Sequence, residues 1–196
     1  MIKEDIQTMN IKYLQESLDN NDLINNIIYF KTIDSTNDYA KKENLETKTL
    51  IFTDEQTKGR GTKQRKWFSE SEKNIMMTIY LKPNKNIIEY KNLTIKIAEC
   101  IKNAINKKYK ICLDIKEPND LLLNNKKICG ILTETIVQSE IVKELIIGIG
   151  FNVNQEQFND EIVDIATSLK KETEKEYLRE EIVISLCDEL EKLLLG

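Results

Sequence analysis

Hydrophobic residues follow two spacings along the chain, one typical of helices and one typical of strands. Helical spacing predicts helices at residues 9–18, 39–42, 92–109 and 176–195. The first buries Ile11, Leu14 and Leu18 on one face. The second follows Asp34, Ser35 and Thr36, whose side chains suit a helix N-cap.

Apolar segments of strand length fill much of the remaining chain. They predict strands at residues 27–33, 49–53, 74–81, 111–115, 120–123, 127–137 and 142–150. Turn signals such as Pro118-Asn119 and Asn124-Asn125 separate the later strands, which favours hairpins. We therefore expect an α+β fold, with a mixed, mainly antiparallel β-sheet and flanking helices. Residues 58–66, with two glycines and five Lys or Arg residues, are predicted to be a loop.

Length and composition bound the kind of protein. The 196 residues suit a single domain, and 40% hydrophobic and 32% charged residues give a globular balance without a membrane span. The first seven residues lack the apolar stretch of a secretory signal, so we expect a cytoplasmic protein. Its four cysteines, Cys100, Cys112, Cys129 and Cys187, are then expected to be reduced structural thiols in apolar surroundings.

Two features of the charged residues exclude classes of function. The chain has no histidine, which excludes a Ser-His-Asp triad, a Cys-His dyad and nearly every zinc site. Its net charge of -4 argues against broad attraction to nucleic acid, and the basic loop lacks interleaved aromatic residues. Chemistry must therefore rely on Lys, Arg, carboxylates and amides.

Four segments carry candidate chemistry. The basic loop can bring backbone N–H groups and arginines to an anion, although a solvated turn explains it as well. Residues 116–120, Lys-Glu-Pro-Asn-Asp, present an amide and a carboxylate at a turn, as an ordinary hairpin would. At residues 127–132 a lysine opens an apolar strand that Gly130 interrupts, which indicates a close ligand or a β-bulge. Residues 147–154 lack the third glycine and the following helix of a dinucleotide fingerprint.

Taken in order, these segments resemble the catalytic domain of biotin protein ligases. Ser35-Thr36-Asn37 follows the first predicted strand, and Gln56 precedes the Gly-Arg-Gly loop that ends in residues 65–69, Arg-Lys-Trp-Phe-Ser. Lys-x-Pro-Asn-Asp at residues 116–120, Lys-x-x-Gly-Ile-Leu at 127–132, Gly-x-Gly-x-Asn at 148–152 and Ala-Thr-Ser-Leu at 166–169 complete the pattern. The resemblance covers residues 27–169 and implies the fold that class II aminoacyl-tRNA synthetases share with biotin ligases.

The resemblance implies an ATP-dependent ligase. It would join biotin to AMP as biotinoyl-5'-AMP, with Mg²⁺, and transfer biotin to a lysine of a biotin carboxyl carrier protein. Lys127, Arg60 and Asp120 would be catalytic, with Lys127 a protonated electrostatic catalyst and Asp120 orienting the acceptor lysine. Ligands would contact Ser35, Thr36, Asn37, Gln56, Gly59, Arg60, Gly61, Thr62, Arg65, Trp67, Asn119, Lys127, Gly130 and Asn152. No metal ligand is assigned firmly, and Asn119 and Asn152 are the candidates for Mg²⁺ and the phosphates.

Three departures from the family pattern stand out. Thr62 occupies the position of a second loop arginine, Gln64 that of a later glycine, and Glu117 that of a tryptophan. We expect the loop to close less firmly because Thr62 lacks the charge-assisted contact of an arginine, which contributes about 1.5–3 kcal/mol. Glu117 puts any stacking or packing role of the tryptophan position in doubt. We also expect one catalytic domain over residues 1–196, with a short helical lead at 1–26, no winged-helix DNA-binding domain, no C-terminal β-barrel and hence no repressor role.

Two other functions remain open. A lipoate or octanoate ligase or transferase shares the fold, but those families usually carry an Arg-Arg-x-Ser-Gly-Gly-Gly-type segment and a nearby histidine. A non-catalytic biotin-binding protein would keep the pocket and lose turnover, although the presence of Lys127, Asn119 and Asp120 argues against it. No nucleic-acid or membrane partner is expected, and exposed sheet edges are compatible with a homodimer.

Overall fold

A computed structural model describes residues 9–62 and 65–196. The helical elements are α1 Ile11–Leu18, α2 Thr36–Lys42, η2 Ile87–Tyr90, α3 Leu93–Tyr109, α4 Leu169–Thr173 and α5 Arg179–Leu195. The strands are β1 Asn26–Ile33, β2 Thr49–Gln56, β3 Ile75–Leu81, β4 Lys85–Asn86, β5 Asp114–Lys116, β6 Asp120–Leu123, β7 Lys126–Gln138 and β8 Ile141–Phe151.

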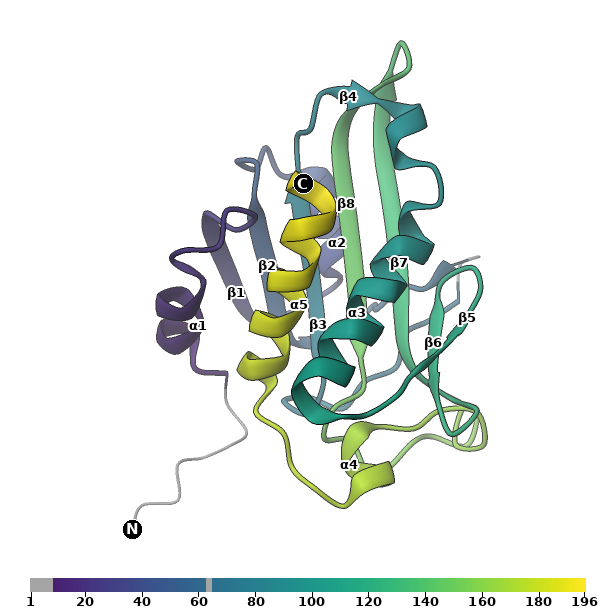
Figure 1. Ribbon diagram of the computed structural model, residues 1–196. Coiled ribbons are helices and arrows are strands. Elements are labelled where there is room, and N and C mark those ends of the chain that lie inside the picture. The colour runs from purple at the N-terminus through teal and green to yellow at the C-terminus, as the bar shows by residue number, and fades with distance from the viewer. Residues whose placement is uncertain (1–8, 63–64) are drawn as a thin grey trace.

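The strands form one sheet in the order β1-β2-β3-β8-β7-β6-β5, and the short β4 pairs with β8 (Figure 1). β1 and β2 are parallel, because α2 crosses between them, and the other pairs are antiparallel. The expected α+β fold with a mixed, mainly antiparallel sheet is therefore confirmed.

The larger core lies between one face of the sheet and the helices α3 and α5, which run side by side across it (Figure 1). α3 contributes Ile97, Ile101 and Ile105 at helical spacing, all fully buried. β8 contributes Ile147 and Ile149. The helices α3 and α5 therefore do not cover the opposite face of the sheet.

On that opposite face, α2 covers only part of the sheet. Ala40 and Leu45 pack there on Ile51, Tyr80 and Ile146 in a small second core. Because strand side chains alternate between faces, the residues next to Ile146 in the period-two series, Gly148 and Gly150, also lie on the α2 face. They have no side chains, so the sheet beside α2 is left uncovered.

A buried ion pair fastens α5 to the sheet. Arg179 Nη1 lies 2.8 Å from Asp54 Oδ1 and 3.2 Å from the Asn74 carbonyl oxygen, and the two side chains are 2% and 0% exposed. Tyr29 also donates its hydroxyl to Asp54. Burial, followed by the Asp54 hydrogen bond, raises the pKa of Tyr29 to about 12, so the phenol stays protonated as a donor.

Most predicted elements are present, but several predicted boundaries are wrong. α2 begins at Thr36 and not at residue 39, and β2 continues to Gln56 and does not end at residue 53. The strand expected at residues 111–115 begins at Asp114, because Lys110 ends α3 in a left-handed conformation and Leu113 turns into the core. The helix expected from residue 176 begins at Arg179, since Asn154 binds both backbone groups of Tyr177. β4, η2 and α4 were not predicted.

All four cysteines lie in the described part of the chain and are unpaired. Burial raises the pKa of the Cys129 and Cys187 thiols, as expected of structural cysteines. Cys112, however, is exposed, so the expectation of apolar surroundings is wrong for that residue. No helix in the described residues is both long enough and apolar enough to cross a membrane.

Candidate active site

The floor of the site is the uncovered part of the sheet beside α2. Gly130 on β7 pairs with Gly150 on β8, and Gly148 pairs with both Leu132 and Thr78. A Cβ atom on Gly148 would lie 2.2 Å from Asn37 Oδ1, and one on Gly150 would lie 2.5 Å from Trp67 Cε2. The glycines are required because an amide and an indole rest directly on the backbone.

The start of α2 supplies polar groups at one end. Ser35 caps the helix, which points Thr36 and Asn37 of its first turn towards the sheet. Gln56 Oε1 accepts from the Thr36 backbone N–H at 2.9 Å, and the Thr78 hydroxyl lies 2.6 Å from Asn37 Oδ1. Thr78 was not expected from the sequence, although its place on β3 opposite Gly148 follows from the strand register.

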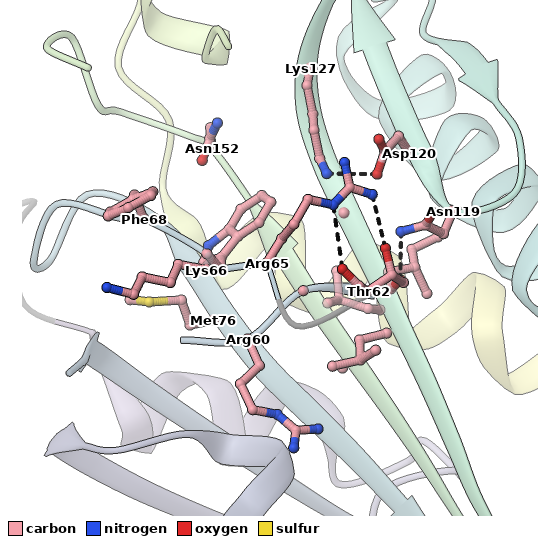
Figure 2. A pocket seen from close by; sticks show the side chains of 18 of the residues that line it. Arg60, Thr62, Arg65, Lys66, Phe68, Met76, Asn119, Asp120, Lys127 and Asn152 are labelled. Carbon is pink, nitrogen blue, oxygen red and sulfur yellow. Dashed lines mark hydrogen bonds and ion pairs between the residues drawn. The ribbon is translucent and has the colours of Figure 1, made fainter. Parts of the chain in front are cut away.

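Lys127 and Asp120 form an ion pair of 2.6 Å between Nζ and Oδ1 at another part of the site (Figure 2). The ammonium also lies 5.5 Å from the centre of the Trp67 ring, within cation–π range. The Lys127 backbone donates to Ile165 O and accepts from Thr167 N, which fixes the strand beneath the side chain. A cation is thus held in place by backbone bonds as well as by its own contacts.

In the basic loop (residues 58–66), residues 58–62 and 65–66 form two limbs that lie against each other. Arg60 and Lys66 form an antiparallel bridge, and Trp67 N donates to Gly59 O at 2.9 Å. Gly59 is buried, and a Cβ there would lie 2.6 Å from Trp67 O, so it permits the two limbs to approach. Gly59 was expected to contact a ligand, but it lies outside the cavity lining.

Two of the departures from the family pattern are visible. Thr62 accepts two hydrogen bonds from the Arg65 side chain, one at its carbonyl oxygen and one at its hydroxyl (Figure 2). Thr62 therefore orients the neighbouring arginine within the loop. Glu117 is exposed and does not line the cavity. Gln64, the third departure, lies outside the described residues.

Two asparagines, Asn119 and Asn152, also line the site. Asn119 donates its amide to the Ile131 carbonyl, and Asn152 donates its amide to the Thr167 carbonyl. Within the described residues, the buried Asn152 Oδ1 and Trp67 Nε1 have no hydrogen-bond partner. Because an unsatisfied buried polar atom is costly, these atoms indicate where a polar ligand would bind.

A cavity of about 320 Å³ joins these groups. Of the site residues predicted from the sequence, it is lined by Ser35, Thr36, Asn37, Gln56, Arg60, Gly61, Thr62, Arg65, Trp67, Asn119, Asp120, Lys127, Gly130 and Asn152. In Figure 2, Arg65, Asn119, Asp120 and Lys127 lie close together, and the Arg60 guanidinium is directed away from them. The lining also includes Phe68, Met76 and Ile165, which sequence patterns did not indicate.

Residues 29–152 match the family model described as the biotin/lipoate A/B protein ligase family. The chain belongs to this family. It is 39% identical over 170 residues to the bifunctional ligase/repressor BirA of Bacillus spizizenii, a match that covers 83% of this chain and 52% of the relative. It is 27% identical to BirA of Escherichia coli over 165 residues, which are 83% of this chain and 50% of that protein. The chain thus spans about half the length of these curated relatives.

Solved structures give the same family. The biotin protein ligase of Aquifex aeolicus in complex with biotin and ATP superposes with a TM-score of 0.76 at 32% identity, over 88% of this chain and 71% of that one. The biotin protein ligase of Leishmania major with biotinyl-5-AMP has a TM-score of 0.70 at 23% identity, over 87% and 75% of the two chains, and shows the shared fold. The expected biotin ligase-like fold is confirmed.

Proposed function

We propose that the chain is the catalytic domain of an ATP-dependent biotin protein ligase. Biotin's carboxylate oxygen would attack the α-phosphorus of ATP, so that the bond to pyrophosphate breaks and biotinoyl-5'-AMP forms. The amine of a carrier lysine would then attack the acyl carbon and release AMP. The first step brings two anions together in line, biotin's carboxylate and the triphosphate, and lysine, arginine and backbone amides can hold them without histidine.

The observation that carries this proposal is the position of the Lys127 ammonium. It lies over the Trp67 ring and 2.6 Å from Asp120, in a cavity that also reaches the polar start of α2. We assign Lys127 to the carboxylate and the developing adenylate, where a fixed positive charge stabilises the transition state. Asp120, its partner, would orient the acceptor amine once the substrates occupy the site.

The remaining residues divide between the two substrates. Ser35, Thr36, Asn37 and Gln56 would hold biotin's ureido ring. Gly61, Thr62 and the backbone of Arg60 would lie near its carboxylate, since the Arg60 guanidinium is bound to Asp38 and Glu134. Arg65, Trp67, Asn119 and Asn152 would serve the nucleotide, and Gly130 leaves room for the Trp67 ring, since a Cβ there would lie 2.9 Å from it. Trp67 Nε1 and Asn152 Oδ1, which have no hydrogen-bond partner in the described residues, support a polar ligand where the nucleotide would bind.

Magnesium would accompany ATP, as it does in most nucleotide enzymes. The Asn152 side-chain oxygen fits this ion, because Mg²⁺ prefers oxygen ligands and this atom has no hydrogen-bond partner in the described residues. The bound ion would neutralise phosphate charge. Asn119 and Asn152 would orient the triphosphate through their remaining amide N–H groups.

The acceptor would be the biotin carboxyl carrier protein of a biotin-dependent carboxylase. A relative at 32% identity from Paracoccus denitrificans is named biotin--[acetyl-CoA-carboxylase] ligase, which supports this class of acceptor. The reaction would take place in the cytoplasm, and the unpaired cysteines are compatible with that reducing compartment. A homodimer would also be compatible with the open sheet.

The direct test mixes the protein with biotin, Mg²⁺-ATP and a carrier domain and follows the carrier's mass. We expect one biotinoyl group to be added, and the Lys127→Ala variant to be about 100- to 1000-fold slower. Lys126→Ala is the matched control, since its side chain points to the other face of β7. Equal rates for wild type and Lys127→Ala would contradict the assigned role.

The same assay separates the other candidate functions. Preference for lipoate or octanoate over biotin in competition would indicate a lipoyl- or octanoyl-transferring enzyme. Biotin binding without pyrophosphate release or carrier labelling would indicate a non-catalytic binding protein.

A further inference from the structure

Arg60 of the basic loop directs its guanidinium away from Lys127, Asp120 and Arg65 (Figure 2). Its Nη1 lies 2.9 Å from Asp38 Oδ1 on α2, and its Nη2 lies 2.7 Å from Glu134 Oε1 on β7. The arginine therefore bridges carboxylates on two different elements. Arg65, by contrast, donates to Thr62 within the loop.

Glu134 is the centre of this cluster. Its Oε1 accepts from Arg60 and from Lys41, and its Oε2 accepts from Asn37 Nδ2 at 2.9 Å. Burial alone would raise the pKa of this carboxyl group, but the hydrogen bonds from Lys41 and Asn37 and the charge of Arg60 outweigh burial and lower it. Glu134 is thus a carboxylate bound by three donors, with a side chain 24% exposed.

The strand register explains how one residue can reach both partners. Glu134 lies on the α2 face of β7, two residues beyond Leu132, which pairs with Gly148 beneath Asn37. The Arg60 backbone pairs with Lys66, and its neighbour Gly59 pairs with Trp67. Holding the Arg60 side chain therefore holds both limbs of the basic loop.

We propose that Glu134, with Asp38, is a positioning residue that fixes the basic loop over the cavity through Arg60 and fixes Asn37 at the same time. It touches neither substrate in the proposed reaction. Its carboxylate couples the residue assigned to biotin's ring with the loop assigned to biotin's carboxylate. A Gln at this position could accept from Asn37 but would present its NH₂ group to both cations, Arg60 and Lys41.

Limited trypsin digestion without ligands tests this coupling directly. The basic loop offers cleavage after Lys58, Arg60, Lys63, Arg65 and Lys66. Loss of a charge-assisted anchor should increase local opening, so we expect Glu134→Gln to speed cleavage in the loop about fivefold to tenfold. Asp38→Asn should act in the same direction.

Glu140→Gln is the matched control. It removes the same charge from an exposed turn between β7 and β8, away from the cluster, and should leave loop cleavage unchanged. Combining Glu134→Gln with Arg60→Gln should add little to either single change, because both remove the same interaction. Faster cleavage confined to the loop, with unchanged cleavage in the rest of the chain, would support the proposal.

Two results would overturn it. Unchanged loop cleavage in Glu134→Gln would mean that the cluster does not hold the loop. Faster cleavage across the whole chain, and not in the loop alone, would mean that Glu134 stabilises the fold generally and does not position the loop.

The kinetic consequence rests on the proposed ligase function. In the adenylation assay, Glu134→Gln should raise KM for biotin about fivefold with little change in kcat, since the residue positions binding groups and not reacting atoms. A fall in kcat at constant KM would contradict this assignment. If wild type forms no adenylate, the proposed function fails, whereas the digestion result still decides whether Glu134 anchors the loop.

Discussion

Replacing Gly150 with alanine would test whether the bare sheet is needed to seat Trp67. The new Cβ would lie 2.5 Å from Trp67 Cε2 and 2.7 Å from Cζ2, whereas carbon atoms in contact normally lie about 3.5–4.0 Å apart. The backbone of a central strand cannot yield, because β8 is hydrogen-bonded to β3 and β7. The indole must therefore move away by about 1 Å.

The displacement should weaken nucleotide binding. Stacking of a base on an aromatic ring contributes about 1–3 kcal/mol, so losing the ring's position predicts a fall in ATP affinity of about fivefold to 100-fold. The contact between Lys127 and the indole, about 0.5–1 kcal/mol at such a site, would be lost as well. The effect on folding should be smaller, because the ring can swing towards the open cavity.

Trp67 is the only tryptophan in the chain, so its fluorescence reports the movement directly. We expect a red-shifted emission maximum in Gly150→Ala and a weaker response to ATP. Ile147→Val, on the same strand but facing the α3 and α5 side, is the control and should leave the emission unchanged. Wild-type emission and ATP affinity in Gly150→Ala would refute the proposed seating of Trp67.

Three further changes have clear expected outcomes. Arg179→Ala leaves the Asp54 carboxylate buried without its partner and should lower the free energy of unfolding by about 3–5 kcal/mol in urea titrations; a loss below 1 kcal/mol would contradict this. The pKa of Glu134 is lowered in the folded state, so its carboxylate stabilises the fold above its usual pKa of 4.5, and this contribution declines as the pH falls. In Glu134→Gln, the free energy of unfolding should therefore fall less steeply between pH 5 and 3. An unchanged slope of the free energy of unfolding against pH would contradict this expectation. A thiol reagent should label exposed Cys112 in the native protein and spare buried Cys129 and Cys187, as mass spectrometry would reveal.

Structural features that depend on residues close together in the sequence could be predicted. The helix cap at Ser35, the hairpins around residues 118 and 124, and the α3 stripe follow from neighbours a few positions apart. The family resemblance, which rests on the order of the motifs, also predicted most of the polar residues that line the cavity. The glycines in residues 147–150 could be recognised as unusual, but their reason depends on Asn37 and Trp67, which are more than 80 residues away in sequence.

Residues that act through long-range pairing could not be predicted in this way. Thr78 and Glu134 are ordinary strand residues until the register sets one opposite Gly148 and the other beside Arg60. The start of α5 was misplaced for a similar reason, because Asn154 captures the backbone of Tyr177 from 23 residues away. Local propensity contains no information about such partners.

Side chains alternate between the two faces of β8, so selection should act on each face for a different reason. Ile147, Ile149 and Phe151 bury their side chains in the larger core, whereas Gly148 and Gly150 serve only to leave space. A mutational scan scored by protein abundance would therefore rank the isoleucines as critical and underrate the glycines. Scored by carrier labelling, the same strand should show sensitivity at both sets of positions, and the difference between the two scans would map the binding surface without a ligand-bound structure.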